Sequence, residues 1–531
     1  MSSTLTKKCI THLLFGIICI TASFSLVHVV PEWEIVGKWI GFLSSLSFSL
    51  ILLFSIRLFC PEHQLLKYFK SFPLYLTSAN IAVAIYCILQ IIGVCNNNSL
   101  YKAVADFDNP TGVASLLCVT FPFAFRIVEN RSRNIITVVF FIIDSIILYI
   151  IKSRTGLITL SLSFAVGLIL EINKTKAKGY LLTLSIVLLL ITSASIPYLF
   201  FNKTASTKGR MVIVDTCLQM ITDRPLFGHG IHGFGREYMH YQAEYFKTIE
   251  DNNILMLSDN VSHPLSEYLL ISVNYGLFGL LIVLALIVLA IKRAFKKKGH
   301  FRTFLLMEVC TICIFSLFSY PFRYPMTTLA LLCCIAPWLF KIIKDLPQFY
   351  WKVLSIFAII TGIVFLVIIG NWYMALTKCK EITDKLNTDT TSAIEIKHDI
   401  FPLTDKPMSL SPRYLYSRAV VNYYAEDYVQ ALLDAHNSSN MLSSYNTELL
   451  IGNIHQKMSN YDDAEIHYWE AAYMCPSKIM PLYRLFKLYE EQGDTVNMVN
   501  IGHKLLDKPV KVHSRDTRAM RLDVRRKLLY L

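Results

Sequence analysis

The sequence has few charged residues. Asp, Glu, Lys and Arg make up 17% of its 531 residues, whereas 54% of the residues are hydrophobic and the mean hydropathy is +0.46. A soluble domain carries charges at about a quarter of its positions, so the shortage excludes an ordinary water-soluble enzyme. The hydrophobic residues are gathered in blocks of about 20, the length of helix that crosses the hydrocarbon core of a bilayer.

These blocks predict an all-α fold, a polytopic membrane bundle of about eleven spans. The first block is not read as a signal peptide, because its apolar core is too long and no clear cleavage site follows it. We place the spans roughly at 9–30, 36–56, 72–94, 112–126, 135–151, 156–172, 179–201, 265–290, 303–320, 326–340 and 353–371.

The basic excess belongs to the membrane part. The formal charge of +13 lies entirely before Asn371, because the 20 basic residues from there on are balanced by 20 acidic ones. A nucleic-acid-binding protein would instead gather basic residues on one soluble face. Most basic residues flank one side of the spans, and the positive-inside rule makes that side cytoplasmic. The N-terminus is therefore predicted to be cytoplasmic, with the large loop 202–264 and residues 372–531 on the outer face.

The composition changes after residue 371 to that of a soluble helical domain, and a period of 33 to 34 residues appears. Tyr428 recurs as Tyr461 and more weakly as Thr495. The middle copy has small residues and an aromatic at the positions where paired repeat helices cross. The sequence therefore predicts a transmembrane domain over 1–371 and a tetratricopeptide-like helical solenoid over 372–531. An accidental period in an ordinary helical bundle is the alternative.

Metal binding is not expected. Cys310 and Cys313 match half of a zinc site, but they lie in a predicted span and no second half follows. His229, His232 and His240 permit a metal site without indicating one. We therefore predict neither a metal nor another cofactor.

Charged residues near membrane depth are costly and are functional candidates by default. Arg154 lies in a tight outer connection, where the positive-inside rule disfavours charge, and it either has an anionic partner or extends to lipid headgroups. Arg210 is predicted near the N-terminus of a helix over 210–222. The glycines that follow Arg224 have no preceding strand and no Lys-Ser/Thr after them, so they predict turns and not a phosphate loop.

His263 closes the outer loop, and Glu267 lies four residues further on. If a helix begins by His263, the two side chains share one face, and the carboxylate can orient the imidazole or raise its basicity. Such a histidine suits removal of a hydroxyl proton. A helix-capping or interfacial histidine is the alternative interpretation.

Four motifs follow one another along the chain. They are Phe107-Asp108-Asn109-Pro110-Thr111-Gly112, then Ser153-Arg154-Thr155-Gly156, then Gly209-Arg210 with Asp223-Arg224-Pro225-Leu226-Phe227-Gly228-His229-Gly230, then His263-Pro264-Leu265-Ser266-Glu267-Tyr268 with Asn274-Tyr275-Gly276-Leu277-Phe278-Gly279-Leu280. In this order they resemble the O-antigen ligase family, whose members also include O-antigen polymerases and protein O-oligosaccharyltransferases. The likeness is good over about 100–290 and looser elsewhere.

The resemblance implies a metal-independent glycosyltransferase of the bacterial cytoplasmic membrane. It would move a glycan from an undecaprenyl-diphosphate carrier to the hydroxyl of a lipid, glycan or protein acceptor on the outer face. The family's diphosphate-binding arginines map to Arg154 and Arg210, and its candidate base maps to His263, followed here by Pro264 where many relatives have Asn. We also expect three residues of these motifs to bind substrate: Arg224, Asn109 and Glu267.

Other functions stay open at this stage. Within the same family the chain can be a polysaccharide polymerase, and the repeats do not separate this from ligation. A transporter or flippase would place ionisable residues in the middle of spans, where Asp144 is the only clear acid. A membrane scaffold would use the repeats to hold a protein partner and would leave the arginines and the histidine replaceable.

Overall fold

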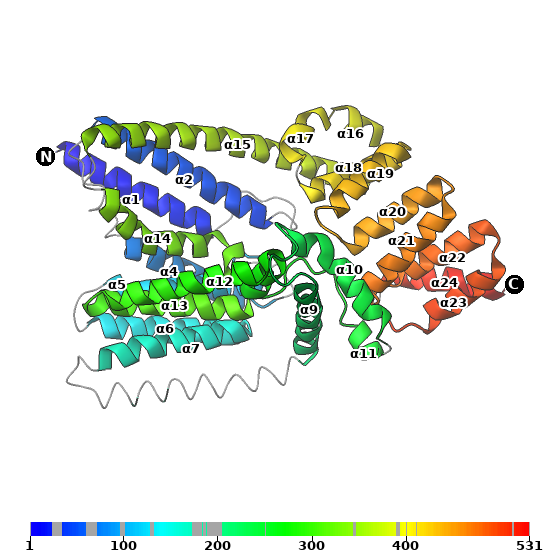
Figure 1. The fold of residues 1–531 in the computed structure, drawn as a ribbon, viewed down its shortest axis with the longest axis horizontal. Helices are drawn as coiled ribbons and strands as arrows, with labels where there is room; N and C mark the ends of the chain where they lie inside the picture. Colours follow the sequence, from blue (N-terminus) through cyan, green and yellow to red (C-terminus); the bar gives the residue numbers. More distant parts are fainter. Residues whose placement is uncertain are drawn as a thin grey trace. The chain divides into compact units, whose positions relative to one another are not determined.

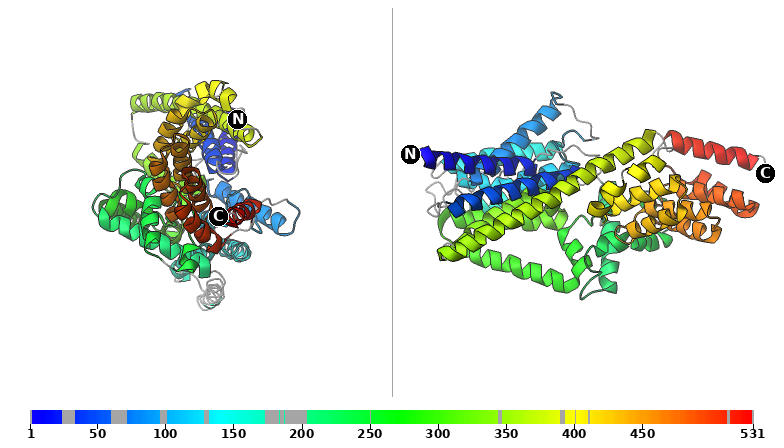
Figure 2. Two further views of the ribbon diagram at one scale, coloured as in Figure 1. Left: turned by 90° about the vertical axis from the view of Figure 1, so that its right-hand side faces the viewer. Right: turned by 90° about the horizontal axis from the view of Figure 1, so that it is seen from above.

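The computed structural model divides the chain into two compact units, Met1–Asn202 with Val283–Met374, and Lys203–Ile282 with Ala375–Leu531. Within the described residues every regular element is a helix (Figures 1 and 2). The described residues are 2–23, 34–59, 72–95, 101–127, 132–172, 183, 187, 204–249, 251–343, 347–388, 393–399, 401–409, 411–511 and 514–529.

The first unit is built from long apolar helices. Two more helices, α12 (Glu267–Phe295) and α15 (Gln348–Thr388), contain residues of both units. The helices of the first unit are α1 (Ser2–Ser23), α2 (Glu34–Phe59), α4 (Phe72–Ile91), α5 (Pro110–Ile127), α6 (Ser132–Ile150), α7 (Arg154–Ile172), α13 (Gly299–Phe318), the 3-10 turn η2 (Pro321–Arg323) and α14 (Pro325–Ile343).

Seven helices in the described part of the chain are long and apolar enough to cross a membrane. They coincide with seven of the predicted spans, so the prediction of a multi-pass membrane protein is confirmed. Three shorter apolar helices, Leu13–Ser23, Ile135–Ile150 and Pro325–Ile335, coincide with three more. The predicted span 179–201 lies outside the described residues apart from 183 and 187, and the sidedness of the bundle stays a prediction.

Helix α5 is the centre of the first unit. Every residue from Gly112 to Phe125 is buried, and α5 packs against α4, α6, α7, α13 and α14. Two acids are buried inside this bundle. Asn80 donates a hydrogen bond to Asp144 (3.2 Å), and Glu308 has no hydrogen-bond partner among the described residues. Asp144 is therefore not the only acid within a span.

The second unit contains the loop helices and the C-terminal helices. Helices α18 and α19, α20 and α21, and α22 and α23 pack as consecutive hairpins (Figure 1). The helices of this unit, besides parts of α12 and α15, are α9 (Thr204–Asp223), α10 (Gly233–Lys247), α11 (Asn252–Leu255), α16 (Ala393–Asp399), α17 (Phe401–Met408), α18 (Pro412–Tyr424), α19 (Tyr428–Ser439), α20 (Tyr445–Lys457), α21 (Tyr461–Met474), α22 (Met480–Gln492), α23 (Thr495–Asp507) and α24 (Arg515–Leu529).

The N-cap residue of the second helix in each hairpin recurs with the repeat period. Asp427, Asn460 and Asp494 occupy the N-cap positions of α19, α21 and α23. The Asp427 carboxylate accepts a hydrogen bond from the backbone N–H of Gln430, and the Asp494 carboxylate accepts one from the backbone N–H of Asn497. A side-chain acceptor at this position satisfies an otherwise unpaired helical N–H group. The helical hairpins thus follow the predicted period, while their assignment as tetratricopeptide repeats stays a prediction.

The loop helices share a hydrophobic core with the C-terminal helices. Phe234, Tyr238 and Met239 of α10 pack in one buried cluster with Tyr445 and Met474. Polar contacts join the same segments. The Gln242 side-chain amide donates to the carbonyl oxygens of Asp259 (3.0 Å) and Met474 (2.7 Å). Ser477 donates two hydrogen bonds of 2.9 Å to Ser258, from its backbone amide to the Ser258 hydroxyl and from its hydroxyl to the Ser258 carbonyl oxygen. Residues 203–282 therefore belong to the same compact unit as the C-terminal helices.

Gly452 permits the close crossing of α20 and α21. A Cβ atom at this position would lie 2.6 Å from the ring of Tyr468, which is fully buried. We predict that Gly452→Ala loosens this hairpin, at a cost of about 1–3 kcal/mol for overpacking a core. Hydrogen exchange of α20 and α21 in the full chain measures the effect. Val496→Ala, at an exposed position of α23, is the control, and its free energy of unfolding is expected to change by no more than about 0.5 kcal/mol. Equal protection in both variants would contradict the prediction.

Candidate active site

Helix α12 is interrupted near its N-terminus. Gly276 has φ 65° and ψ −163°, outside the helical range, so the segment before it and the segment after it are separate helical pieces. In a continuous helix, the carbonyl oxygens of Val273 and Asn274 would accept from the amides of Leu277 and Phe278. The break removes these bonds and leaves four backbone groups that need other partners.

The turn that follows α9 supplies all four partners. The Val273 and Asn274 carbonyl oxygens accept from the amides of His229 and Gly230, each at 2.8 Å. The Leu277 amide donates to the Pro225 carbonyl oxygen (2.8 Å), and the Phe278 amide donates to the Leu226 carbonyl oxygen (3.2 Å). Two of the four sequence motifs, 223–230 and 274–280, therefore interlock through their backbones.

Two glycines make this close approach possible. Gly228 has φ 66°, and a Cβ atom there would lie 2.5 Å from the Val273 carbonyl oxygen. A Cβ atom on Gly276 would lie 2.3 Å from the Leu226 carbonyl oxygen. Gly228 and Gly230 form turns as predicted, whereas Gly233 and Gly235 do not, because they lie in the first turn of α10.

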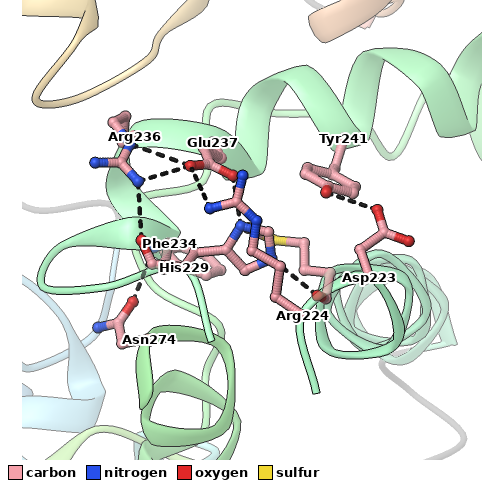
Figure 3. Close-up of polar contacts among 9 residues, drawn as sticks. Asp223, Arg224, His229, Phe234, Arg236, Glu237, Tyr241 and Asn274 are labelled. Carbon is pink, nitrogen blue, oxygen red and sulfur yellow. Dashed lines mark hydrogen bonds and ion pairs between the residues drawn. The ribbon is translucent and has the colours of Figure 1, made fainter. Parts of the chain in front are cut away.

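A polar network surrounds the interlocked turn (Figure 3). The His229 ring is buried between the Glu237 carboxylate (2.5 Å from Nδ1) and the Met220 carbonyl oxygen (2.8 Å from Nε2). Both ring nitrogens of His229 therefore face hydrogen-bond acceptors. Arg236 donates to Glu237 Oε1 (2.7 Å) and to the His229 carbonyl oxygen (2.8 Å). With both ring nitrogens engaged, His229 is not placed to act as a base.

The same network lowers the pKa of Glu237. Burial acts to raise the pKa of this carboxyl group, but the hydrogen bonds from Arg236 and His229 outweigh burial and favour the ionised form. Arg224 adds a longer ion pair, 4.0 Å from Glu237 Oε1, and its side chain is 57% exposed. Two arginines thus converge on one carboxylate, and one of them keeps most of its surface accessible.

His263 and Glu267 meet, although not in the predicted way. Helix α12 begins at Glu267, two residues after the predicted start of this span at 265, so His263 lies before the helix and the condition for a shared helical face is not met. The residue before a proline is disfavoured in the helical region. A turn with Leu265 at φ 59° brings His263 Nε2 to 4.0 Å from Glu267 Oε2. The Leu265 amide donates to His263 Nδ1 (3.1 Å), so the proton of the neutral ring lies on Nε2, facing the carboxylate.

Arg210 lies within a helix and not at its start. Helix α9 begins at Thr204, so the predicted helix over 210–222 is correct in type but starts six residues earlier. Arg210 is partly buried, and Gly209 beside it lies against Leu257, six residues before His263. The residue therefore belongs to the same unit as His263, Glu267 and Arg224.

Asn109 and Arg154 belong to the first unit. The Asn109 side chain caps α5 by accepting from the Thr111 amide (2.8 Å), and it also donates to the Tyr320 hydroxyl (3.3 Å). Arg154 is the first residue of α7 and is 9% exposed. A Cβ atom on Gly156 would lie 3.1 Å from Ala114, so the starts of α5 and α7 adjoin. Asn109 and Arg154 are thus brought to one end of this bundle.

Two histidines of the loop 202–264 have carboxylate partners. His240 Nδ1 lies 3.0 Å from Glu470, and His229 is engaged as described above. Within the described residues, no group of three or more His, Cys, Asp or Glu side chains is arranged to hold a metal ion.

The region that contains the interlocked motifs is also the part of the chain that matches a known protein family. Residues 139–284 match the family model described as O-antigen ligase. The match to the O-antigen ligase model includes Arg154, Arg210, Arg224, His263 and Glu267, and it ends before the C-terminal helices. It supports a membrane glycosyltransferase of the O-antigen ligase and polymerase type. No curated protein matches the chain.

Sequence reasoning missed Arg236 and Glu237 in this O-antigen ligase-like region. Neither lies in a motif that suggests chemistry, and the pairing of Glu237 with His229 depends on the chain reversal at residues 228–232. The one available signal was the combination of a histidine, several glycines and an arginine–glutamate pair within ten residues. Such a cluster predicts a polar turn but does not specify which side chains pair.

The interlocked turn can be tested with a matched glycine pair. We predict that Gly228→Ala strongly reduces the hydrogen-exchange protection of the Leu277 and Phe278 amides, because the new Cβ meets backbone. Gly230→Ala is the control, since Gly230 also has a positive φ but no atom within 4 Å of its Cβ position. Both variants bear the left-handed backbone cost of about 1–2 kcal/mol. Equal loss of protection in the two variants would refute the clash.

The lowered pKa of Glu237 predicts a pH dependence of this region. A carboxyl group with a lowered folded-state pKa stabilises the fold above its ordinary value of 4.5 and loses this effect as the pH falls through the lower pKa. Protection of the first turns of α10, corrected for intrinsic exchange, should therefore decline as the pH falls below 4.5. Glu237→Gln should remove this dependence, and an unchanged profile in the variant would show that another group titrates.

Proposed function

We propose that the chain transfers a glycan from an undecaprenyl-diphosphate carrier to an acceptor hydroxyl on the outer face of the bacterial cytoplasmic membrane. The observation that carries this proposal is the match of residues 139–284 to the O-antigen ligase family. That one segment includes the arginines and the histidine that the chemistry requires. The proposed topology has a cytoplasmic N-terminus, with the loop and the C-terminal helices outside.

The proposed reaction is a direct displacement. The acceptor oxygen attacks the anomeric carbon, the bond from that carbon to the diphosphate oxygen breaks, and the anomeric configuration inverts. The departing diphosphate gains negative charge, which permanently charged guanidinium groups stabilise without a metal. Arg154 and Arg210 take this role in the proposal, with Arg224 and Asn109 as further substrate-binding groups.

His263 takes the acceptor proton in this proposal. Nδ1 is the nitrogen without a proton in the neutral ring, and it accepts from the Leu265 amide. The acceptor hydroxyl must displace this amide before Nδ1 can receive the proton. The resulting imidazolium would then be stabilised by the Glu267 carboxylate on the Nε2 side. Proton transfer of this kind contributes about 10²–10⁴-fold to a rate.

The C-terminal hairpins support a role in holding the acceptor or a partner protein. We propose that they are tetratricopeptide-like repeats, on the basis of their period, their caps and the small residue at the crossing of α20 and α21. Ligation to a lipid or protein acceptor is the first form of the proposal, and polymerisation of the glycan is the second. A transporter is the alternative from another class, and the buried acids Asp144 and Glu308 are the observation that favours it.

A transfer assay with a defined lipid-linked glycan tests the proposal. His263→Ala is expected to lower the transfer rate by about 10²–10⁴-fold. Arg154→Ala and Arg210→Ala are each expected to lower it by about 10²–10³-fold, with partial recovery for lysine, which keeps the charge but loses the bidentate geometry.

Matched controls lie close to each arginine. Lys208→Ala on α9 and Lys152→Ala before α7 remove exposed cations two residues away and should leave transfer near the wild-type rate. All variants must be present in the membrane in equal amounts. Transfer at the wild-type rate by all three site variants would contradict the proposed mechanism. Formation of a long glycan polymer that stays attached to the carrier would favour the polymerase form of the proposal.

A further inference from the structure

The turn between α9 and α10 exposes large apolar side chains outside any hydrophobic core. Leu226 is 63% exposed, Phe227 is 73% exposed and Ile231 is 70% exposed. Hydrophobic side chains this exposed and this close together usually mark an interaction surface. Gly228 and Gly230 take positive φ values, so the chain reverses direction between Phe227 and Ile231.

The turn is attached to the exposed surface of a membrane-spanning helix. Phe227 lies against Phe278, with ring centroids 6.0 Å apart, and Phe278 is itself 59% exposed. The apolar window Glu267–Phe295 has the character of a span, and only 11% of it is buried in the protein. Phe227 therefore continues the surface that α12 presents to lipid.

Helix length places this contact near one boundary of the hydrocarbon, which is the outer boundary in the topology proposed above. No charged residue occurs between Glu267 and Lys292. From Gly276 to Lys292 the helix covers roughly 24 Å at about 1.5 Å per residue, compared with a hydrocarbon core of about 30 Å. If Lys292 reaches the inner boundary of the hydrocarbon, Gly276 lies at or just inside the outer boundary. The turn that clamps Gly276 lies at the same depth.

The hydrogen bonds and charges of the turn suit this depth. Hydrocarbon offers no hydrogen-bond partners, so a broken helix there needs its backbone groups satisfied by protein. Pro225, Leu226, His229 and Gly230 satisfy them. Arg224 and Arg236, which precede and follow the apolar side chains in the sequence, both pair with Glu237, and arginines beside an apolar segment can extend to lipid phosphates.

We infer that the turn Pro225–Ile231 inserts into the outer leaflet, with Leu226, Phe227 and Ile231 among the acyl chains of bilayer phospholipids. The occupant of this surface is the bilayer itself and not the lipid carrier of the transfer reaction. The insertion holds the polar network of His229 and Glu237 at the headgroup layer. It does not depend on the proposed glycosyltransferase activity.

Depth-dependent quenching tests the inference in the full chain, reconstituted in vesicles of phosphatidylethanolamine and phosphatidylglycerol. A fluorescent amino acid is placed at position 227 and, in separate samples, at 231 and 466. Ile466 is the matched control because it is apolar and 64% exposed, on α21 of the C-terminal hairpins. Phospholipids brominated on the acyl chains should quench positions 227 and 231 at least twofold more than position 466.

Two outcomes would overturn the inference. Quenching at 227 and 231 that is no stronger than at 466 would place the turn in water. Quenching that appears only when spin-labelled polyprenyl phosphate is added would make the carrier the occupant. Position 231 keeps the test informative if the label at 227 prevents folding, and neither result bears on the loss of transfer in the His263 variant.

Discussion

Backbone hydrogen bonding at the start of a membrane-spanning helix organises the candidate active site. Helix α12 cannot continue through Gly276, and in a low-dielectric environment four unpaired backbone groups would cost several kcal/mol. The turn at 225–230 provides their partners with short bonds. With that turn in place, His229 is buried and α10 begins three residues after the turn. Glu237 is then positioned to form hydrogen bonds with both His229 and Arg236.

Electrostatics gives two histidine–carboxylate pairs different properties. In the pair of His229 and Glu237, both ring nitrogens are hydrogen-bonded and an arginine also donates to the carboxylate. This arrangement suits a role in stabilising the turn. In the pair of His263 and Glu267, the separation is 4.0 Å, and the Leu265 amide donates to the other ring nitrogen of His263. The proposed function gives the proton transfer to this second pair.

The sequence was informative where one physical requirement dominates. Hydrocarbon thickness fixes the length of apolar blocks, so most spans could be located, and residues recurring every 33 to 34 positions indicated the hairpins. Contacts between segments that are far apart in the chain could not be predicted from the sequence. No local pattern showed that Gly228 would face Val273, or that Gln242 would contact Met474. The start of α12 lies two residues from the predicted start of the span at 265, because Pro264 disfavours helical geometry at His263.

The shared core of α10 with the C-terminal hairpins has an evolutionary consequence. Tyr238, Met239 and Gln242 contact Tyr445, Met474 or the segment around it, so each side completes the interior of the other. Such hairpins are not an appendage that a lineage can gain or discard in one genetic event. Their loss would have to be accompanied by replacement of the aromatic and amide residues of α10, and homologues without the hairpins should carry polar residues there.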